Sequence, residues 1–138
     1  MGAVNALSLA FGSNFVGAGP KVRYSRFIRE AASAKLSLHL PGNGPFTYRV
    51  IEFLGVETCM VSPPFETRLH VPIVPGVHFV EVAPDLSTLV DACRYYLANP
   101  DERRTISVAG RQLFEKHLHA DHLAEYMLTE IFARLREK

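Results

Sequence analysis

Cysteine is scarce in this sequence: only Cys59 and Cys93 are present, and no C-x-x-C pair of the kind that holds zinc occurs. Two well-separated cysteines exclude a disulfide-stapled fold. Each is expected to be a small buried hydrophobic residue in a reducing compartment. We therefore predict a cytoplasmic protein.

Basic residues are missing from the first twenty positions, where the apolar stretch is interrupted by Asn5, Gly12 and Asn14. A secretory signal needs a basic flank, and a membrane-spanning helix needs about 20 consecutive apolar residues. The sequence therefore predicts neither a signal peptide nor a transmembrane segment. We expect these residues to belong to the fold.

A strong charge of either sign is also absent. The chain of 138 residues has 15 Lys and Arg against 14 Asp and Glu, a net charge of +1. Nucleic-acid-binding proteins usually carry a basic surface, so nucleic acid is not an expected partner. Hydrophobic residues make up 48% of the sequence, which is typical of a globular protein, and we expect a single domain over 1–138.

Short apolar runs alternate with segments of helical periodicity along the chain. The expected strands are 4–11, 36–40, 58–61 and 77–82, and the expected helices are 24–34, 46–54, 85–97, 100–114 and one from about 121 onward. Asp85 is the expected N-cap of the third helix. This alternation predicts an α/β, three-layer, Rossmann-like fold. Its parallel sheet would have about four strands, with helices on both faces and a helical C-terminal tail.

A glycine-rich turn, Pro41-Gly42-Asn43-Gly44-Pro45, joins an expected strand to an expected helix. The backbone N–H groups of such a turn, together with the helix N-terminus, can hold a phosphate. Arg49 and Glu52 follow on the helix, three positions apart and therefore neighbours. A cation near a phosphate and a carboxylate one turn further on suit a nucleoside diphosphate with its ribose.

A second loop, rich in proline, follows the expected strand 58–61 and begins with Pro63 and Pro64. Ligands of open parallel sheets bind beyond the carboxyl ends of the strands. We therefore expect this loop and the glycine-rich turn to border one crevice, with His78 as a further candidate for its lining.

Plainer interpretations of the same residues remain open. The glycine-rich turn can be a simple connection, and Arg49 with Glu52 can be an exposed pair of a few tenths of a kcal/mol. His117, His119 and His122 do not have the spacing of a helical metal site, so we interpret them as solvated residues at a helix junction.

The run from Ala34 to Glu52, with its P-G-x-G-like turn and R-x-x-E, resembles the C-terminal half of GT-B glycosyltransferases. It is similar more narrowly to the glycosyl transferases group 1 type and to the capsule-associated O-glucosyltransferase branch. The late strand at 75–80 with the helix start at Asp85, and the tail L-x-N-P-x-x-R followed by A-G-R at 97–103 and 109–111, resemble the same families in order and spacing.

The resemblance implies a donor site for a nucleotide sugar, formed by Gly42, Asn43, Gly44, Thr47, Arg49 and Glu52. In it, the three turn residues would approach the diphosphate, Arg49 would neutralise it, and Glu52 would accept hydrogen bonds from the ribose hydroxyls. Such contacts stabilise the departing diphosphate, so neither a cofactor nor a metal is expected.

A complete GT-B enzyme has a second, N-terminal half that binds the acceptor. We therefore expect a glycosyltransferase-like domain that is inactive alone, and that works as a homodimer or with a separate acceptor-domain partner. Two other hypotheses remain: a non-catalytic nucleotide- or phosphate-binding module, and an interaction domain that associates with itself through an apolar face.

Overall fold

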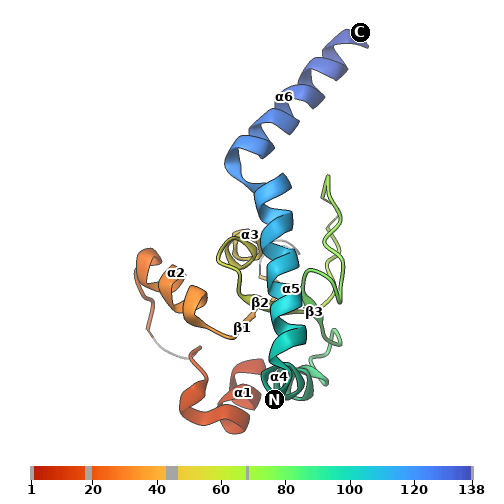
Figure 1. The fold of residues 1–138 in the computed structure, drawn as a ribbon. Helices are drawn as coiled ribbons and strands as arrows, with labels where there is room; N and C mark the ends of the chain where they lie inside the picture. Colours follow the sequence, from red (N-terminus) through yellow and green to blue (C-terminus); the bar gives the residue numbers. More distant parts are fainter. Residues whose placement is uncertain (1, 18–19, 43–46, 68, 138) are drawn as a thin grey trace.

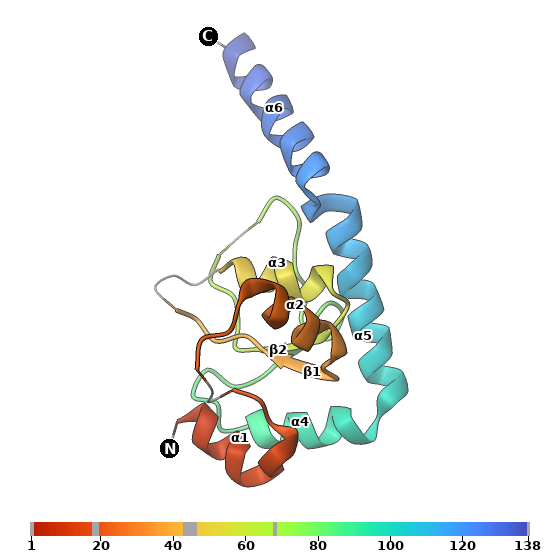
Figure 2. The same ribbon diagram turned by 90° about the vertical axis from the view of Figure 1, so that its left-hand side faces the viewer.

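The computed structural model describes residues 2–17, 20–42, 47–67 and 69–137. Its centre is a parallel sheet in the order β1 (Leu36–Leu38), β2 (Cys59–Ser62), β3 (Val80–Glu81), drawn in Figures 1 and 2. Leu36 lies opposite Cys59 in β2, and Val61 lies opposite Val80 in β3. The predicted α/β fold with a parallel sheet flanked by helices is confirmed.

The helices occupy most of the remaining chain. They are α1 (Ala3–Phe11), which leads into a 3-10 turn (Gly12–Asn14), α2 (Tyr24–Ser33), α3 (Tyr48–Gly55), α4 (Leu89–Ala98), α5 (Pro100–Leu113), a π-helical turn (Phe114–Leu118) and α6 (Ala120–Arg136). None of the helices in the described ranges is long and apolar enough to cross a membrane.

The prediction of a strand over 4–11 is wrong, because this segment is helix α1. Leu7 is buried whereas Leu9 is 76% exposed. Two residues that are two positions apart share one face of a strand but point to different sides of a helix. Ala3 and Leu7, four positions apart, form the buried face instead. The sheet therefore has three strands within the described residues, one fewer than expected.

Each face of the sheet has its own hydrophobic core. Cys59 and Val61 point to the core shared with α1 and α4, and Met60 points to the opposite core shared with α2 and α3. All four residues of β2 are buried, as expected for a strand covered on both faces. Both cysteines are buried and free, and burial raises the pKa of Cys59 to about 12 and that of Cys93 to about 11.

The third strand is shorter than the predicted 77–82, because 74–79 form a turn. His78 N–H donates to the Val74 carbonyl, and Gly76 has a φ of 74°, which favours glycine. Asp85 is not the N-cap of α4, whose N-cap is Thr88. The Asp85 carboxylate accepts hydrogen bonds from the backbone and side chain of Ser87 instead. These bonds lower the pKa of Asp85.

The tail motif ties helices together. Pro100 is the first residue of α5, where its missing N–H costs nothing. Arg103 Nη1 donates to the Tyr96 carbonyl at 2.7 Å, near the end of α4. Arg111 donates to the Gly55 carbonyl at the end of α3. These arginines supply partners for helix C-terminal carbonyls that lack intrahelical donors.

Gly110 lets α5 lie close to the amino ends of β2 and β3. A Cβ at this position would be 2.8 Å from Cδ2 of Leu54 and 3.1 Å from the carbonyl oxygen of His78. Leu54 lies at the end of α3, the helix that leads into β2, and His78 lies two residues before β3. Helix α5 therefore runs past the amino edge and leaves the carboxyl edge uncovered by this helix (Figure 2).

We expect Gly110→Ala to lower the free energy of unfolding by about 1–3 kcal/mol, because the added methyl group overpacks this contact. Helix propensity alone would raise stability by about 1 kcal/mol. Urea unfolding measures the difference, with Gln112→Ala on the exposed side of α5 as the matched control. A more stable Gly110→Ala variant would contradict the close approach.

Candidate functional site at the carboxyl edge of the sheet

The carboxyl ends of β1 and β2 are joined by a pair of buried polar side chains. The His39 backbone N–H continues the ladder to the Val61 carbonyl at 2.9 Å, and His39 Nδ1 lies 3.0 Å from Ser62 Oγ. Pro63 follows Ser62 and is buried, and Pro64 is exposed. The structure thus brings the glycine-rich segment after β1 and the proline-rich segment after β2 to the same edge.

The hydrogen bonds of Ser62 determine the tautomer of His39. The Ser62 hydroxyl has a single proton, and it donates this proton to the Pro63 carbonyl at 2.8 Å. Ser62 Oγ therefore accepts from His39 Nδ1–H, which leaves His39 Nε2 as a bare acceptor. Within the described ranges Nε2 has no hydrogen-bond partner, although His39 is only 1% exposed.

His39 is neutral at physiological pH because its environment disfavours the imidazolium. Burial lowers its pKa, and the positive charge of Arg49 lowers the pKa further. The ring also packs against Phe65, with 5.5 Å between the centroids. The carboxyl edge therefore presents a fixed acceptor rather than a cation.

The N-terminus of α3 lies at the same edge. Thr47 is its N-cap residue, but its side chain makes no capping hydrogen bond. Thr47 Oγ1 is buried and unpartnered among the residues that the structure describes. Gly42 approaches this side chain, since a Cβ at Gly42 would be 4.0 Å from Thr47 Cγ2. Asn43 and Gly44, two further predicted site residues, lie outside the described residues.

Arg49 and Glu52 extend from α3 toward α2. The Arg49 guanidinium lies over the Phe27 ring, 4.2 Å from its centroid. The Glu52 carboxylate lies beside Tyr24, and burial together with this carboxylate raises the pKa of the Tyr24 hydroxyl. No ion pair joins the side chains of Arg49 and Glu52, both of which are described. Each is positioned by an aromatic residue of α2, not by the other.

This edge places a guanidinium and a helix N-terminus beside a carboxylate, on an α/β domain. A protein-family model described as "Glycosyl transferase-like" matches residues 5–129, which include the whole sheet and both loops of the edge. The chain belongs to the glycosyl transferase-like family. The comparison with curated proteins found no match.

Sequence reasoning missed several residues of this candidate site. His39, Ser62, Tyr24 and Phe27 were not predicted, although all four contact or approach a predicted residue or its loop. The available signal was a histidine at the end of a strand, directly before a glycine-rich turn. It carried no information on burial or on a missing partner.

His78, a predicted lining residue, is not brought together with the others. It stands before β3, on the amino side of the sheet, and its carbonyl oxygen faces Gly110 of α5. Its Nδ1 accepts a hydrogen bond from the Val74 backbone N–H at 2.9 Å, and burial lowers its pKa. In the glycosyl transferase-like fold this histidine holds the turn before β3.

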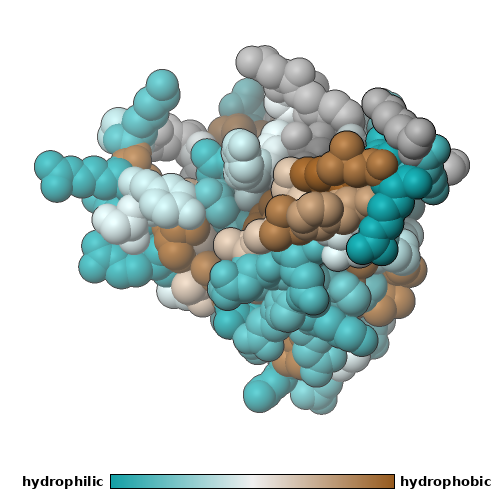
Figure 3. Space-filling view, turned by 90° about the horizontal axis from the view of Figure 1, so that it is seen from above, coloured by the Kyte–Doolittle hydropathy of each residue, from teal (hydrophilic) through white to brown (hydrophobic). Residues whose placement is uncertain are grey.

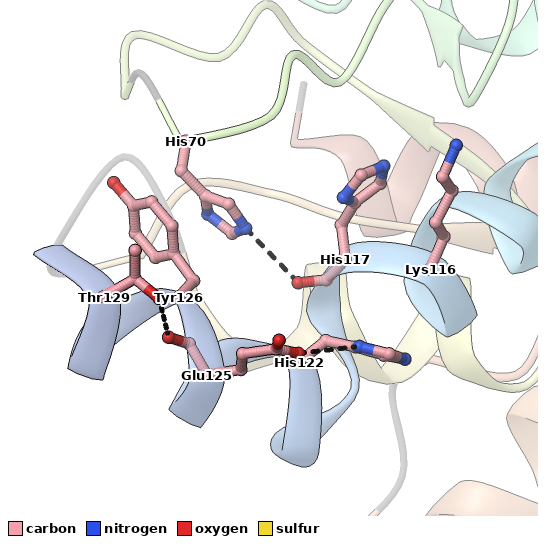
Figure 4. A pocket seen from close by; sticks show the side chains of 7 residues that line it. All are labelled: His70, Lys116, His117, His122, Glu125, Tyr126 and Thr129. Atoms are coloured by element: carbon pink, nitrogen blue, oxygen red, sulfur yellow. Dashed lines mark hydrogen bonds and ion pairs between the residues drawn. The ribbon is translucent and has the colours of Figure 1, made fainter.

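The histidines near the C-terminus lie at the base of α6, away from the carboxyl edge. A hollow of about 290 Å³ is shown in Figure 4, and its lining residues are His70, Lys116, His117, His122, Glu125, Tyr126 and Thr129. His70 stacks on Tyr126, and its Nε2 lies 3.3 Å from the His117 carbonyl. Among the described residues no group of three or more His, Cys, Asp or Glu side chains could hold a metal ion.

The neutral state of His39 predicts a pH dependence of folding. Its pKa is lowered below the ordinary 6.5 in the folded protein, so unfolding takes up a proton once the pH falls below that value. We expect this stability to be fully present above pH 6.5 and to decrease as the pH falls below 6.5. His39→Asn keeps an N–H donor for Ser62 but cannot titrate.

Urea unfolding at several pH values measures this effect, and we expect a shallower decrease for His39→Asn than for the wild type. His78, whose pKa is also lowered, contributes in the same direction, so the variant retains part of the slope. An unchanged slope would show that His39 is not held neutral.

Proposed function

We propose that this glycosyl transferase-like domain binds a nucleoside diphosphate sugar at the carboxyl edge of β1 and β2, as the donor for transfer to an acceptor hydroxyl. The observation that carries the proposal is a pair of buried polar atoms at this edge, His39 Nε2 and Thr47 Oγ1, that have no hydrogen-bond partner among the described residues. Leaving such atoms without a partner costs about 1–3 kcal/mol each. A bound ligand would remove this cost.

The diphosphate would lie at the N-terminus of α3. The backbone N–H groups of Tyr48 and Arg49 in the first turn, the Thr47 hydroxyl and the backbone of Gly42 would donate to its oxygens. Asn43 and Gly44 belong to this proposal as further backbone donors. Arg49 is exposed and near His39, and its planar guanidinium suits two phosphate oxygens at once.

The ribose would lie next to Glu52, further along α3. An ionised carboxylate accepts hydrogen bonds from two adjacent hydroxyls, which matches the 2′ and 3′ positions of a ribose. Arg49 and Glu52 both extend toward α2, so a ligand along this side would contact the two in order.

His39 distinguishes a sugar nucleotide from a simple phosphate. Its Nε2 only accepts hydrogen bonds, so it repels a phosphate oxygen and needs an O–H or N–H from the ligand. A nucleoside diphosphate sugar carries both a diphosphate and several hydroxyls. Pro63, buried at the same edge, would form part of the wall against which the ligand lies.

In the transfer step the charge that develops on the departing diphosphate would be stabilised by Arg49 and the helix N-terminus. We further propose that the acceptor is supplied by a second domain or a partner chain, as in two-domain GT-B enzymes. This domain alone would then bind the donor without transferring the sugar.

Calorimetric titration with UDP, GDP and ADP tests donor binding. We expect one of the three diphosphates to bind, and Arg49→Ala and Glu52→Ala each to weaken it about tenfold or more, the value of a charge-assisted hydrogen bond. Arg26→Ala is the matched control, because Arg26 is exposed on α2 and pairs only with Glu30 among the described acidic residues. No binding of any diphosphate would contradict the proposal.

The role of His39 is tested with the His39→Asn variant and two ligands. We expect His39→Asn to weaken binding of the preferred sugar nucleotide about fivefold or more, the loss of one buried hydrogen bond. Inorganic pyrophosphate lacks the sugar and base, so its affinity should not change. Equal weakening of both ligands would show that His39 acts on the fold of the loop, not on a ligand hydroxyl.

A further inference from the structure

Helix α6 has no buried residue, although its sequence is rich in apolar side chains. Exposed fractions of 51–62% are found at Met127, Leu128, Ile131, Phe132 and Leu135. Figures 1 and 2 show α6 projecting from the body of the domain, and the view from that end shows hydrophobic side chains gathered beside hydrophilic ones (Figure 3). Helices in proteins gain most of their stability by packing an apolar face, and no residue of α6 is buried in this way.

The apolar residues of α6 have the spacing of a helix–helix seam. Ala124, Leu128, Ile131 and Leu135 follow one another at intervals of four, three and four residues. This is the a/d pattern by which two helices pack side by side. Met127 and Phe132 border the seam on its two sides, which gives an apolar face wider than a single row.

Charge changes sign along α6 on both borders of the seam. Asp121, seven residues before Leu128, continues the seam at its amino end, and Glu125 lies on one border next to it. Arg136 lies on the same side near the end of the helix. The other border carries Glu130 followed by Arg134. Asp121 and Glu125 have side chains that are 90% and 80% exposed. Each lies near a histidine of its own chain, His119 at 3.5 Å and His122 at 4.0 Å, and a partner would approach from the exposed side.

We propose that α6 pairs in antiparallel orientation with α6 of a second copy of this chain. With a two-fold axis between Thr129 and Glu130, Leu128 packs on the partner's Ile131 and Ala124 on the partner's Leu135. The same axis brings Arg136 between the partner's Asp121 and the partner's Glu125. A parallel pair would instead place arginines beside arginines, which is unfavourable.

This pairing is independent of donor binding. It uses the face of a helix that projects from the domain, whereas the donor site lies at the carboxyl edge of β1 and β2. Nucleotide affinity therefore serves as a separate check that each α6 variant is folded, or thermal unfolding does so if no nucleotide binds.

Sedimentation velocity of the full chain, from low to high micromolar concentration, tests the pairing. We expect a dimer for the wild type and a monomer for Leu128→Glu, because a carboxylate at the seam would be buried without a partner. Ala133→Glu is the matched control on the opposite face of α6 and should stay dimeric. A monomeric wild type, or a dimer that survives Leu128→Glu, would overturn the proposal.

A charge swap tests the orientation. Arg136→Glu should weaken the dimer, since its side chain would face two carboxylates of the partner. Adding Asp121→Arg and Glu125→Arg to the same chain should restore the affinity, because the two helices exchange signs at both ends. Failure of the triple variant to recover would exclude the antiparallel arrangement.

Discussion

Complete burial of β2 is the constraint on which the rest of the structure depends. Its two faces belong to different cores, and β1 and β3 pair with its two edges. A strand enclosed on every side can offer polar groups to a ligand only where it ends. At its amino end, α5 packs closely through Gly110. The carboxyl end at Ser62 is therefore the place where the sheet can present a site, and His39 connects that end to β1.

The sequence was sufficient for features that follow from local pattern. The buried run of β2, the amphipathic α3 and the Asn99–Pro100 boundary between α4 and α5 all come from residues close together in the chain, and the structure confirms them. It failed at α1, where a short apolar run fits a strand or a helix equally well and only the tertiary core decides. The sequence indicated the wrong role for Asp85, because an aspartate can accept hydrogen bonds from a nearby turn residue as readily as from the first turn of a helix.

The candidate site divides in the same way. Arg49 and Glu52 could be proposed from the sequence because their spacing on a helix is a local property. The hydrogen bonding of His39 depends on Ser62, which is distant in sequence. Tyr24 and Phe27 were missed because they act on α3 from another helix. The tail motif that resembles glycosyltransferases is structural in this chain. Its Arg103 and Arg111 donate hydrogen bonds to carbonyl groups at the ends of other helices and lie apart from the candidate site.

The position of Arg49 over Phe27 has a thermodynamic consequence. An unrestrained arginine on a surface loses side-chain entropy when it binds an anion, which costs about 0.5–1.5 kcal/mol of binding free energy. Here the ring already restricts the guanidinium to a plane, so much of that entropy is lost during folding and not during binding. Under the proposed function, the stability of the fold and the affinity of its edge for an anion would thus be coupled through one stacked pair. A domain that holds its cation this way selects ligands by geometry more than by charge.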